Sequence, residues 1–320
     1  MTNSAVPPSR AGVLGVDFGG TKIAAAIADL DGRILVRGTR SAQVDGSSMN
    51  AVGRGIELVE TLLADTHSAG LEIVGAAAVA PGVHRSEHDP AGFSPNLPAL
   101  DSATLASQLS AVTKVAAAPI WNDVHAAALA ELRSGGLRGA DPGLYLGLGT
   151  GIAAGICIGG EVIRGAHGAA GEIGYLSVGT GPSLGAAADV AQVEELVGGK
   201  ALAERASVLL GEATSTAQLF ERNDPASLQI LHSSLGILAS TVANLATTFD
   251  PSRIVLGGGL MRSGEVILEV VRAQVARQVP APPQIAAAQY VHDASLHGAI
   301  ALALDHRVPR RTPRTAIAGA

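Results

Sequence analysis

The segment VLGVDFGGTKIAAAIADLDGRILVRG, residues 13–38, decides the fold. It holds three short apolar runs. The first two are separated by Gly19-Gly20-Thr21 and the last two by Asp31-Gly32, and both separators are rich in turn-forming residues. Apolar runs of this length bounded by such turns are typical of strands. We therefore expect three short antiparallel strands joined by two turns.

The same pattern returns in LYLGLGTGIAAGICIGGEVIRG, residues 144–165, element for element. Two copies of strand, glycine turn, strand, turn and strand predict a duplicated fold, and the second copy opens a second domain. Apolar runs and helical spacing elsewhere predict further strands near 73–80, 114–121 and 253–256, and helices near 48–69, 102–111, 122–133, 190–210, 227–249, 264–278 and 297–304.

The expected domain organisation follows from this pattern. Residues 1–11 are expected to form a disordered tail, 12–121 a small α/β domain, 122–304 a larger α/β domain, and 305–320 a flexible basic tail. The last helix is expected to pack back on the small domain.

Composition excludes several classes of protein. The chain has 22 Lys and Arg against 28 Asp and Glu, a net charge of −6, whereas nucleic-acid binders usually carry a basic face. No uninterrupted apolar run is long enough to span a membrane, and the polar N-terminus lacks the apolar core of a signal peptide. We expect a cytoplasmic protein with no nucleic-acid or membrane partner. The single cysteine, Cys157, excludes an intrachain disulfide and a multi-cysteine metal site.

Three glycine clusters lie at the ends of apolar strands: Gly19-Gly20, Gly149–Gly151 and Gly257–Gly259. Glycine lets backbone N–H groups approach an anion closely and form a nest for phosphate, although each cluster alone is also compatible with a tight turn. Asp17, beside the first cluster, is suited to holding Mg²⁺ through water, and Lys22 to neutralising phosphate charge. The sequence patterns of the P-loop and the Rossmann fold are both missing.

The segment DFGGTK, residues 17–22, resembles the first phosphate motif of the ROK family of bacterial sugar kinases and sugar-responsive repressors. Further segments resemble other motifs of that family in the same order: SPNLP at 94–98, NDVHAAALAE at 122–131, LGTGI at 148–152, GAAGEIG at 168–174, and FDP through IVLGGG at 249–259. The resemblance covers residues 12 to 304. It implies an α/β, duplicated actin-like and hexokinase-like (ribonuclease H-like) ATPase fold, with two lobes and an interdomain cleft.

The resemblance also implies roles for individual residues. Asp123 matches the family's general base, which accepts the hydroxyl proton during phosphoryl transfer; from this segment alone, a helix N-cap at Asn122 or Asp123 is the alternative. The implied sugar-binding residues are Asn96, Leu97, Asn122, Asp123, Glu172, Tyr175 and Glu194, the last of which could equally lie on a solvated helix face. The implied ATP- and phosphate-binding residues are Asp17, Gly19, Gly20, Thr21, Lys22, Gly149, Thr150, Gly151, Gly257, Gly258 and Gly259.

The chain departs from the family pattern at its zinc site. The family continues from GEIGH into a cysteine cluster that binds a structural zinc, but this chain has Tyr175 in place of the histidine and no cysteine in residues 179–185. We expect no structural zinc, with Cys157 a small buried residue. His125 replaces a family asparagine, and we expect ordinary packing or exposure for it rather than tuning of Asp123.

The leading hypothesis is an ATP- and Mg²⁺-dependent hexose kinase. It would act on C6 of glucose or a related hexose or N-acetylhexosamine, as a homodimer. A DNA-binding regulator is disfavoured by the acidic charge and by the shortness of the segment before Val13. A catalytically silent sugar-binding or sensor protein of the same fold remains the alternative.

Overall fold

The computed structural model describes residues 10–43, 51–67, 70–83, 101–118, 120–179, 185, 190 and 192–307. The predicted sugar-binding residues Asn96 and Leu97 lie outside these ranges. The chain divides into two compact units, each of which is described by itself. One comprises Met1–Ala80, Ser94–Ile120 and Ala299–Ala320, and the other comprises Pro81–Phe93 and Trp121–Gly298.

The first unit is built on the sheet predicted from residues 13–38. Strands β1 (Arg10–Phe18), β2 (Lys22–Asp29) and β3 (Ile34–Ser41) pair antiparallel, which confirms the three expected strands. Strand β4 (Leu71–Ala80) pairs with β1 in parallel, and the order within this unit is β3-β2-β1-β4. The first strand begins at Arg10, inside the segment expected to be a tail.

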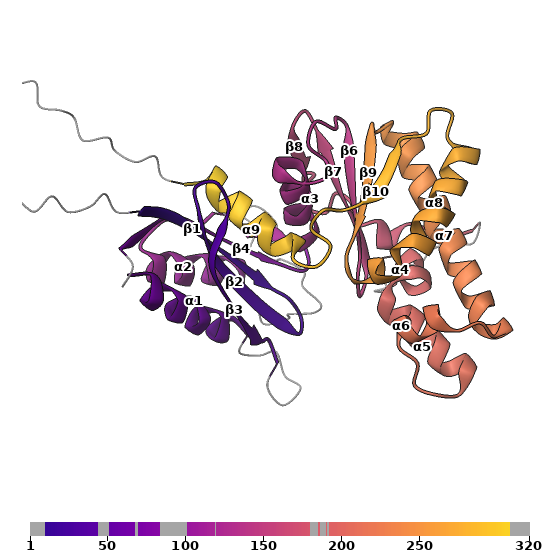
Figure 1. Cartoon of the computed structure of the whole chain (residues 1–320), viewed down its shortest axis with the longest axis horizontal. Coiled ribbons are helices and arrows are strands. Elements are labelled where there is room, and N and C mark those ends of the chain that lie inside the picture. The colour runs from indigo at the N-terminus through magenta and orange to yellow at the C-terminus, as the bar shows by residue number, and fades with distance from the viewer. Residues whose placement is uncertain are drawn as a thin grey trace, which may run out of the picture. The chain divides into compact units, whose positions relative to one another are not determined.

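The two faces of this sheet are covered by different helices (Figure 1). Successive side chains of a strand point to opposite faces. Leu14, Val16 and Phe18 of β1 therefore join one core with helices α1 (Ala51–His67) and α2 (Ser102–Thr113). On the other face Gly15 leaves room for helix α9 (Ala294–Asp305), because a Cβ at Gly15 would lie 2.8 Å from the backbone N of Ile300.

The second unit repeats this sheet. Strands β6 (Gly143–Leu148), β7 (Ile152–Ile158) and β8 (Glu161–Ile163) pair antiparallel, as the second sequence copy predicts. Strands β9 (Arg253–Gly257) and β10 (Gln284–Ala287) extend it in parallel on the side of β6. The order β10-β9-β6-β7-β8 therefore contains the same arrangement as β4-β1-β2-β3.

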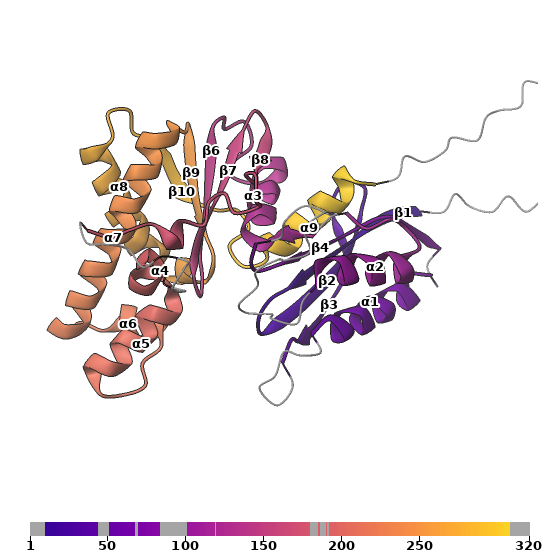
Figure 2. The same ribbon diagram turned by 180° about the vertical axis from the view of Figure 1, so that it is seen from behind.

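Helices cover both faces of the second sheet (Figure 2). On one face Leu144, Leu146 and Leu148 pack with α7 (Pro225–Phe249) and α8 (Gly264–Gln278). On the other, Tyr145 packs with α3 (Asp123–Ser134), which follows the two-residue strand β5 (Trp121–Asn122). The remaining helices are α4 (Gln192–Val197), α5 (Gly199–Leu210) and α6 (Thr216–Glu221), with 3-10 turns η1 (Ile173–Tyr175) and η3 (Gly259–Ser263).

Helix α7 has the length and apolar composition of a membrane span, with a mean hydropathy of 1.3 over its most apolar window. That window is 61% buried inside the structure, however. Leu235, Leu238, Val242 and Leu245 of this helix belong to the core of the second unit. The helix is therefore accounted for as a core helix.

Two predicted elements differ from the structure. The strand expected near 114–121 is wrong: Ala117 alone bridges to Ala76, and β5 has only two residues. The sequence has Pro119 there, which lacks the N–H that a ladder requires. The single helix expected over 190–210 is also wrong, because Gly198 adopts an extended conformation that separates α4 from α5.

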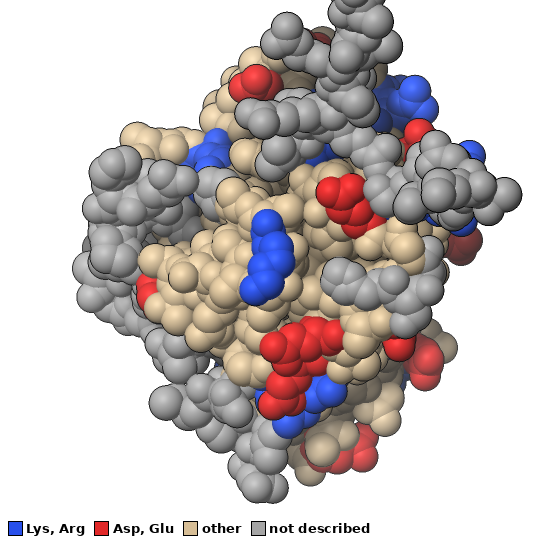
Figure 3. All heavy atoms as spheres, turned by 90° about the vertical axis from the view of Figure 1, so that its left-hand side faces the viewer, with Lys and Arg blue, Asp and Glu red and all other residues tan. Residues whose placement is uncertain are grey.

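Acidic and basic side chains are interspersed on the face of the molecule shown in Figure 3. This mixture fits the small net charge of −6. The expectation that the protein has no nucleic-acid partner remains a prediction.

Candidate active site

The amide of Asn122 fixes the start of helix α3. Its Oδ1 accepts hydrogen bonds from the backbone N–H groups of Val124 (2.8 Å) and His125 (3.2 Å), which is an N-cap. Its Nδ2 donates to the Gly82 carbonyl at 2.9 Å, and the residue is only 6% exposed. The cap foreseen at this position is therefore Asn122, and Asp123 becomes the first residue of the helix.

Two glycines let α3 lie directly on the second hairpin, formed by β6 and β7. A Cβ at Gly147 would lie 3.2 Å from Cγ2 of Val124, and a Cβ at Gly155 would overlap the Cβ of Ala128. Any larger residue at either position would push the helix away. The close packing places the turn that carries Asp123 beside the strand ends that flank Gly149–Gly151.

The turn that carries Glu172 is fixed to the same hairpin at Gly171. Gly171 has φ +85°, and a Cβ there would overlap the carbonyl oxygen of Ala154 in β7. The backbone N–H of Ala154 donates to the Gly171 carbonyl at 2.8 Å, and the N–H of Ile173 donates to it at 2.7 Å. Only glycine combines this positive φ with this closeness to β7.

Three carboxylates of the second unit act on one another. Burial raises the pKa of Glu172 to about 7, and the negative charges of Asp123 and Glu194 add to the shift. Burial also raises the pKa of Asp123 above its ordinary value, opposed by backbone N–H groups that include that of Val124. A higher pKa makes the Asp123 carboxylate a better acceptor of a hydroxyl proton.

The tip of the second hairpin is held by the start of helix α5. The backbone N–H of Gly199 donates to the Gly149 carbonyl at 2.9 Å, and that of Lys200 donates to the Thr150 carbonyl at 3.2 Å. The first N–H groups of a helix lack partners within it, so they are available for such bonds. Both carbonyl oxygens, which would repel a phosphate, are therefore occupied by the helix.

Glu194 lies beneath the same tip rather than on a solvated helix face. Its Oε2 accepts a hydrogen bond from the backbone N–H of Ile152 at 3.0 Å. A Cβ at Gly151 would overlap this carboxylate. The glycine at 151 therefore makes room for an acidic side chain from α4.

The first hairpin, formed by β1 and β2, is held in a similar way. The Gly20 carbonyl accepts from Nε2 of Gln43 at 3.0 Å, and the Thr21 carbonyl accepts from the N–H of Ala42 at 2.8 Å. Asp17 lies half-buried near the end of β1, and Lys22 is exposed at the start of β2.

The third glycine cluster lies beside the second hairpin. A Cβ at Gly258, where φ is +93°, would overlap the backbone of Leu148. A Cβ at Gly257 would lie 2.7 Å from Oη of Tyr145. These glycines are required by packing, whereas Gly259 opens η3 with free space around its Cβ position.

The structure thus brings many of the predicted site residues into one unit. The second unit holds Asn122, Asp123, Glu172, Tyr175, Glu194, Gly149, Thr150, Gly151, Gly257, Gly258 and Gly259, and the first holds Asp17, Gly19, Gly20, Thr21 and Lys22. Tyr175 is half-buried at the end of η1. The role of each in catalysis or binding remains a prediction.

Sequence reasoning missed the supporting contacts of three residues. These are Gly171 with Ala154, Gly199 with Gly149, and His125, expected only to be packed or exposed, with Ala170. The Gly198-Gly199 pair inside an apparently helical run was a usable signal, because glycine disfavours a helix interior.

Cys157 is buried in β7, as expected, and burial raises the pKa of its thiol to about 12. In the described ranges no group of three or more His, Cys, Asp or Glu side chains is placed to hold a metal. Residues 180–184 and 186–189 lie outside those ranges, so the absence of zinc remains a prediction.

Mg²⁺ fits Asp17, since this ion commonly uses one carboxylate together with water and substrate phosphates.

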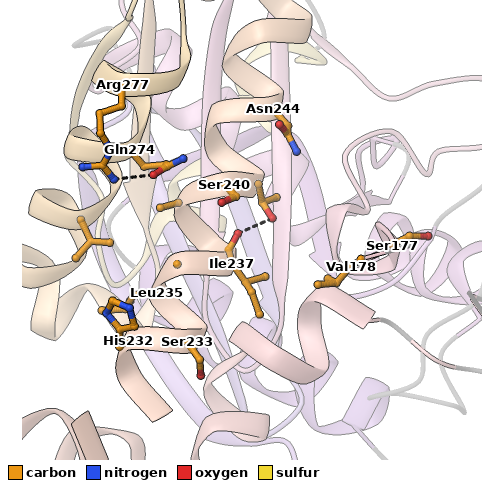
Figure 4. A pocket seen from close by; sticks show the side chains of 15 residues that line it. Ser177, Val178, His232, Ser233, Leu235, Ile237, Ser240, Asn244, Gln274 and Arg277 are labelled. Carbon is orange, nitrogen blue, oxygen red and sulfur yellow. Dashed lines mark hydrogen bonds between the residues drawn. The ribbon is translucent and has the colours of Figure 1, made fainter. Parts of the chain in front are cut away.

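A separate cavity of about 650 Å³ lies in the second unit. It is lined by α7, α8 and residues 177–179, with Ser240, Asn244 and Arg277 among the polar side chains (Figure 4). The described residues that line it include none of the predicted site residues. The cavity is therefore distinct from the set of residues around Asp123.

Known proteins resemble this chain along most of its length. The model of the ROK family matches residues 13–306. A glucokinase of Thermotoga maritima is 28% identical over 313 residues, which cover 91% of this chain and 96% of that protein. An N-acetylmannosamine kinase of Escherichia fergusonii is 31% identical over 299 residues, covering 91% of this chain and 97% of that protein.

Comparison with solved structures gives the same family. A ROK family glucokinase from Streptomyces griseus, in complex with glucose and AMPPNP, is 28% identical with a TM-score of 0.73. The match covers 92% of this chain and 99% of that one. The likeness across both units confirms the expected α/β fold class of the actin-like, hexokinase-like ATPases.

Proposed function

This chain belongs to the ROK family, and on that premise we propose that it is an ATP-dependent kinase that phosphorylates a hexose hydroxyl with Asp123 as general base. The reaction class, phosphotransfer to an alcohol acceptor, is that of its relatives. One observation carries the assignment of the base: the half-buried Asp123 opens a helix whose first turn packs on Gly147, two residues before the glycine turn at Gly149–Gly151.

The proposed reaction needs one proton acceptor and one aligned phosphate. The hydroxyl oxygen of the sugar forms a bond to the γ-phosphorus while its proton passes to the Asp123 carboxylate. The bond from that phosphorus to the oxygen bridging it to the β-phosphate breaks, and ADP leaves. Because burial raises the pKa of Asp123, the carboxylate is suited to accept this proton and then release it to solvent.

The sugar would be bound by polar side chains near this base. We propose Glu172, Tyr175 and Glu194 as hydrogen-bonding partners of sugar hydroxyls, together with Asn122 and, outside the described residues, Asn96. Leu97, also outside those residues, is proposed as a sugar-binding residue without a side-chain hydrogen bond. Glucose or an N-acetylhexosamine is the proposed acceptor class, with C6 as the site of transfer. The names of the relatives, glucokinase and N-acetylmannosamine kinase, support both classes.

The phosphates of ATP would be bound by the two hairpins. In each hairpin, two carbonyl oxygens accept hydrogen bonds from neighbouring donors. Because carbonyl oxygens repel an anion, their engagement by donors supports a role of the hairpins in binding phosphate. Gly257–Gly259 would border the adenosine. Mg²⁺ would be held through water by Asp17 and would neutralise phosphate charge. A cytoplasmic location and a homodimer also remain proposals.

An assay of ADP release over a panel of hexoses tests this function. The panel is glucose, mannose, N-acetylglucosamine and N-acetylmannosamine, and we expect turnover with at least one of them. Asp123→Asn should lower kcat by roughly 10³-fold, in the range of general-base catalysis, while changing sugar affinity by less than about tenfold.

Two results would contradict the proposal. Tight sugar binding without turnover of any hexose by the wild-type protein would favour the silent sugar-binding alternative. Unchanged kcat in Asp123→Asn would reject Asp123 as the base. Glu195→Gln is a suitable control, since Glu195 is an exposed acid that follows Glu194 on the same helix.

A further inference from the structure

His125 is a buried polar residue whose ring has a defined partner. It is 2% exposed, and its Nε2 lies 2.7 Å from the carbonyl oxygen of Ala170. A carbonyl oxygen can only accept a hydrogen bond, so Nε2 carries the hydrogen and donates it. His125 lies two residues after Asp123, about 200° around the helix axis, so the two side chains leave α3 on different sides.

Ala170 is also held from its N–H side. This group donates to the carbonyl of Arg164 at 3.1 Å. The guanidinium of Arg164 lies 4.9 Å from the ring centroid of Trp121, a cation–π distance. Trp121 directly precedes Asn122 and Asp123 in sequence, so both connections of Ala170 lead back to the start of α3.

The hydrogen bonds of Ala170 affect the distance between the carboxylates of Asp123 and Glu172. Glu172 follows Ala170 by two residues, and its charge interacts with that of Asp123. Like charges in a poorly solvated place repel each other, so the turn must be anchored for both to keep their positions. The bond from His125 to Ala170 anchors the turn from α3 itself, which is the helix that Asp123 begins.

We infer that His125 is a positioning residue, which holds the Ala170 carbonyl and thereby sets the place of Glu172 relative to Asp123 for binding the sugar. This inference rests on the proposed function. It replaces the expectation that His125 is only packed. An apolar ring of similar size would fill the same space but would leave the Ala170 carbonyl without this donor.

The test compares His125→Phe, which keeps a ring without the donor, with His125→Gln, which keeps an N–H donor. We expect His125→Phe to raise the KM for the hexose at least tenfold while the KM for ATP stays within twofold. His125→Gln should bring the hexose KM back to within threefold of wild type. His232→Phe, at an exposed histidine of α7, is the control and should change neither constant.

A second readout needs no turnover. In hydrogen exchange of the full-length protein, peptides covering residues 168–174 should exchange at least fivefold faster in His125→Phe than in wild type, and peptides from α7 should not change. Arg164→Met is a second variant, which keeps the backbone carbonyl that accepts from Ala170 but removes the guanidinium that holds residue 164 against Trp121. It should accelerate exchange in the same peptides, and it serves as the test if His125→Phe does not fold.

The outcomes separate this inference from the proposed function. A wild-type protein without hexose turnover would defeat the proposed function, and the exchange experiment would then decide the inference by itself. An unchanged hexose KM in folded His125→Phe, or unchanged exchange in residues 168–174, would overturn the positioning role. Faster exchange confined to that turn, with rescue by His125→Gln, would support it.

Discussion

The two glycine hairpins are copies of one sequence pattern that are held by different donors. In both, two successive carbonyls at the tip are hydrogen-bonded: those of Gly20 and Thr21 in the first, and those of Gly149 and Thr150 in the second. The first uses the side chain of the exposed Gln43 and a backbone N–H, whereas the second uses two backbone N–H groups at the start of a helix.

The surroundings differ as well. The second hairpin has Glu194 beneath its tip, the Glu172 turn fixed on β7, and the helix of Asp123 packed on its glycines. One hairpin pattern therefore stands in two different surroundings, and under the proposed function both copies bind phosphate while the second also supports the acidic residues of the sugar site. Sequence similarity between the copies does not reveal this division of roles.

Gly171→Ala should produce the largest effect, because it breaks the link between the second hairpin and the Glu172 turn. A Cβ at this position would overlap the Ala154 carbonyl, so the turn has to move. We expect kcat/KM for the hexose to fall roughly 100-fold, the cost of misplacing a binding group by about 1 Å. Steady-state kinetics of ADP release measure it.

The control for this variant is Gly211→Ala. Gly211 also has a positive φ, +68°, but nothing lies within 4 Å of its Cβ position. It should lose about 1–2 kcal/mol of stability with unchanged kinetics. Equal losses of activity in the two variants would mean that backbone strain, rather than the contact with β7, explains the result.

Gly199→Ala tests the helix support of the second tip. A Cβ at Gly199 would lie 2.7 Å from the Gly149 carbonyl oxygen, so α5 and the tip would separate and their hydrogen bonds would weaken. Loss of about 1.4 kcal/mol corresponds to a roughly tenfold higher KM for ATP. The hexose KM should change less.

Gly236→Ala in α7 is the matched control, since its Cβ position is open. This change should stabilise the protein by about 0.5–1 kcal/mol through helix propensity and leave both KM values unchanged. An ATP KM in Gly199→Ala equal to that of wild type would show that the tip does not depend on α5.

Glu172→Gln sharpens the electrostatic side of the comparison. The folded-state pKa of Glu172, about 7, lies above its ordinary value of 4.5. The folded protein therefore binds a proton that the unfolded chain releases, and this contribution to stability is lost as pH rises from about 4.5 to about 7. Glutamine carries no charge at either pH, so the variant should not lose this stability as pH rises.

Allowing for solvent screening of a half-buried group, Glu172→Gln should be more stable than wild type by about 1–2 kcal/mol at pH 8, with the difference closing toward pH 4.5. Urea unfolding at the two pH values measures it, with Glu195→Gln as the exposed control. A difference that is the same at both pH values would contradict the interaction among the three carboxylates.

Gln43→Ala should have the smallest effect. It removes a single exposed hydrogen bond to the Gly20 carbonyl, 3.0 Å long, worth less than about 1 kcal/mol. We expect the KM for ATP to rise about twofold. A tenfold rise in the KM for ATP would contradict the comparison, because the first hairpin would then depend on its donor as strongly as the second.

Sequence reasoning predicted what local patterns determine. The hairpins, the helix that begins at Asp123, and the duplicated sheet all follow from apolar runs and turn residues within short windows. The contacts that hold the site were not predictable in this way. His125 with Ala170 and Gly199 with Gly149 join residues about 45 and 50 positions apart, so only the folded chain brings them together.

The helix break at Gly198 shows the same limit. A Cβ at Gly198 would lie 2.9 Å from the Thr150 carbonyl oxygen and 2.8 Å from that of Glu194. The extended backbone at this residue is therefore set by packing against the hairpin tip. Propensity alone identified a glycine pair but not what it contacts.

A crystal structure of the protein with its hexose, Mg²⁺ and a non-hydrolysable ATP analogue tests the central claim most directly. The account predicts a carboxylate oxygen of Asp123 within about 2.6–3.2 Å of the sugar hydroxyl that faces the γ-phosphate. A bound hexose whose reactive hydroxyl contacts a different side chain, with Asp123 out of hydrogen-bond reach, would contradict it.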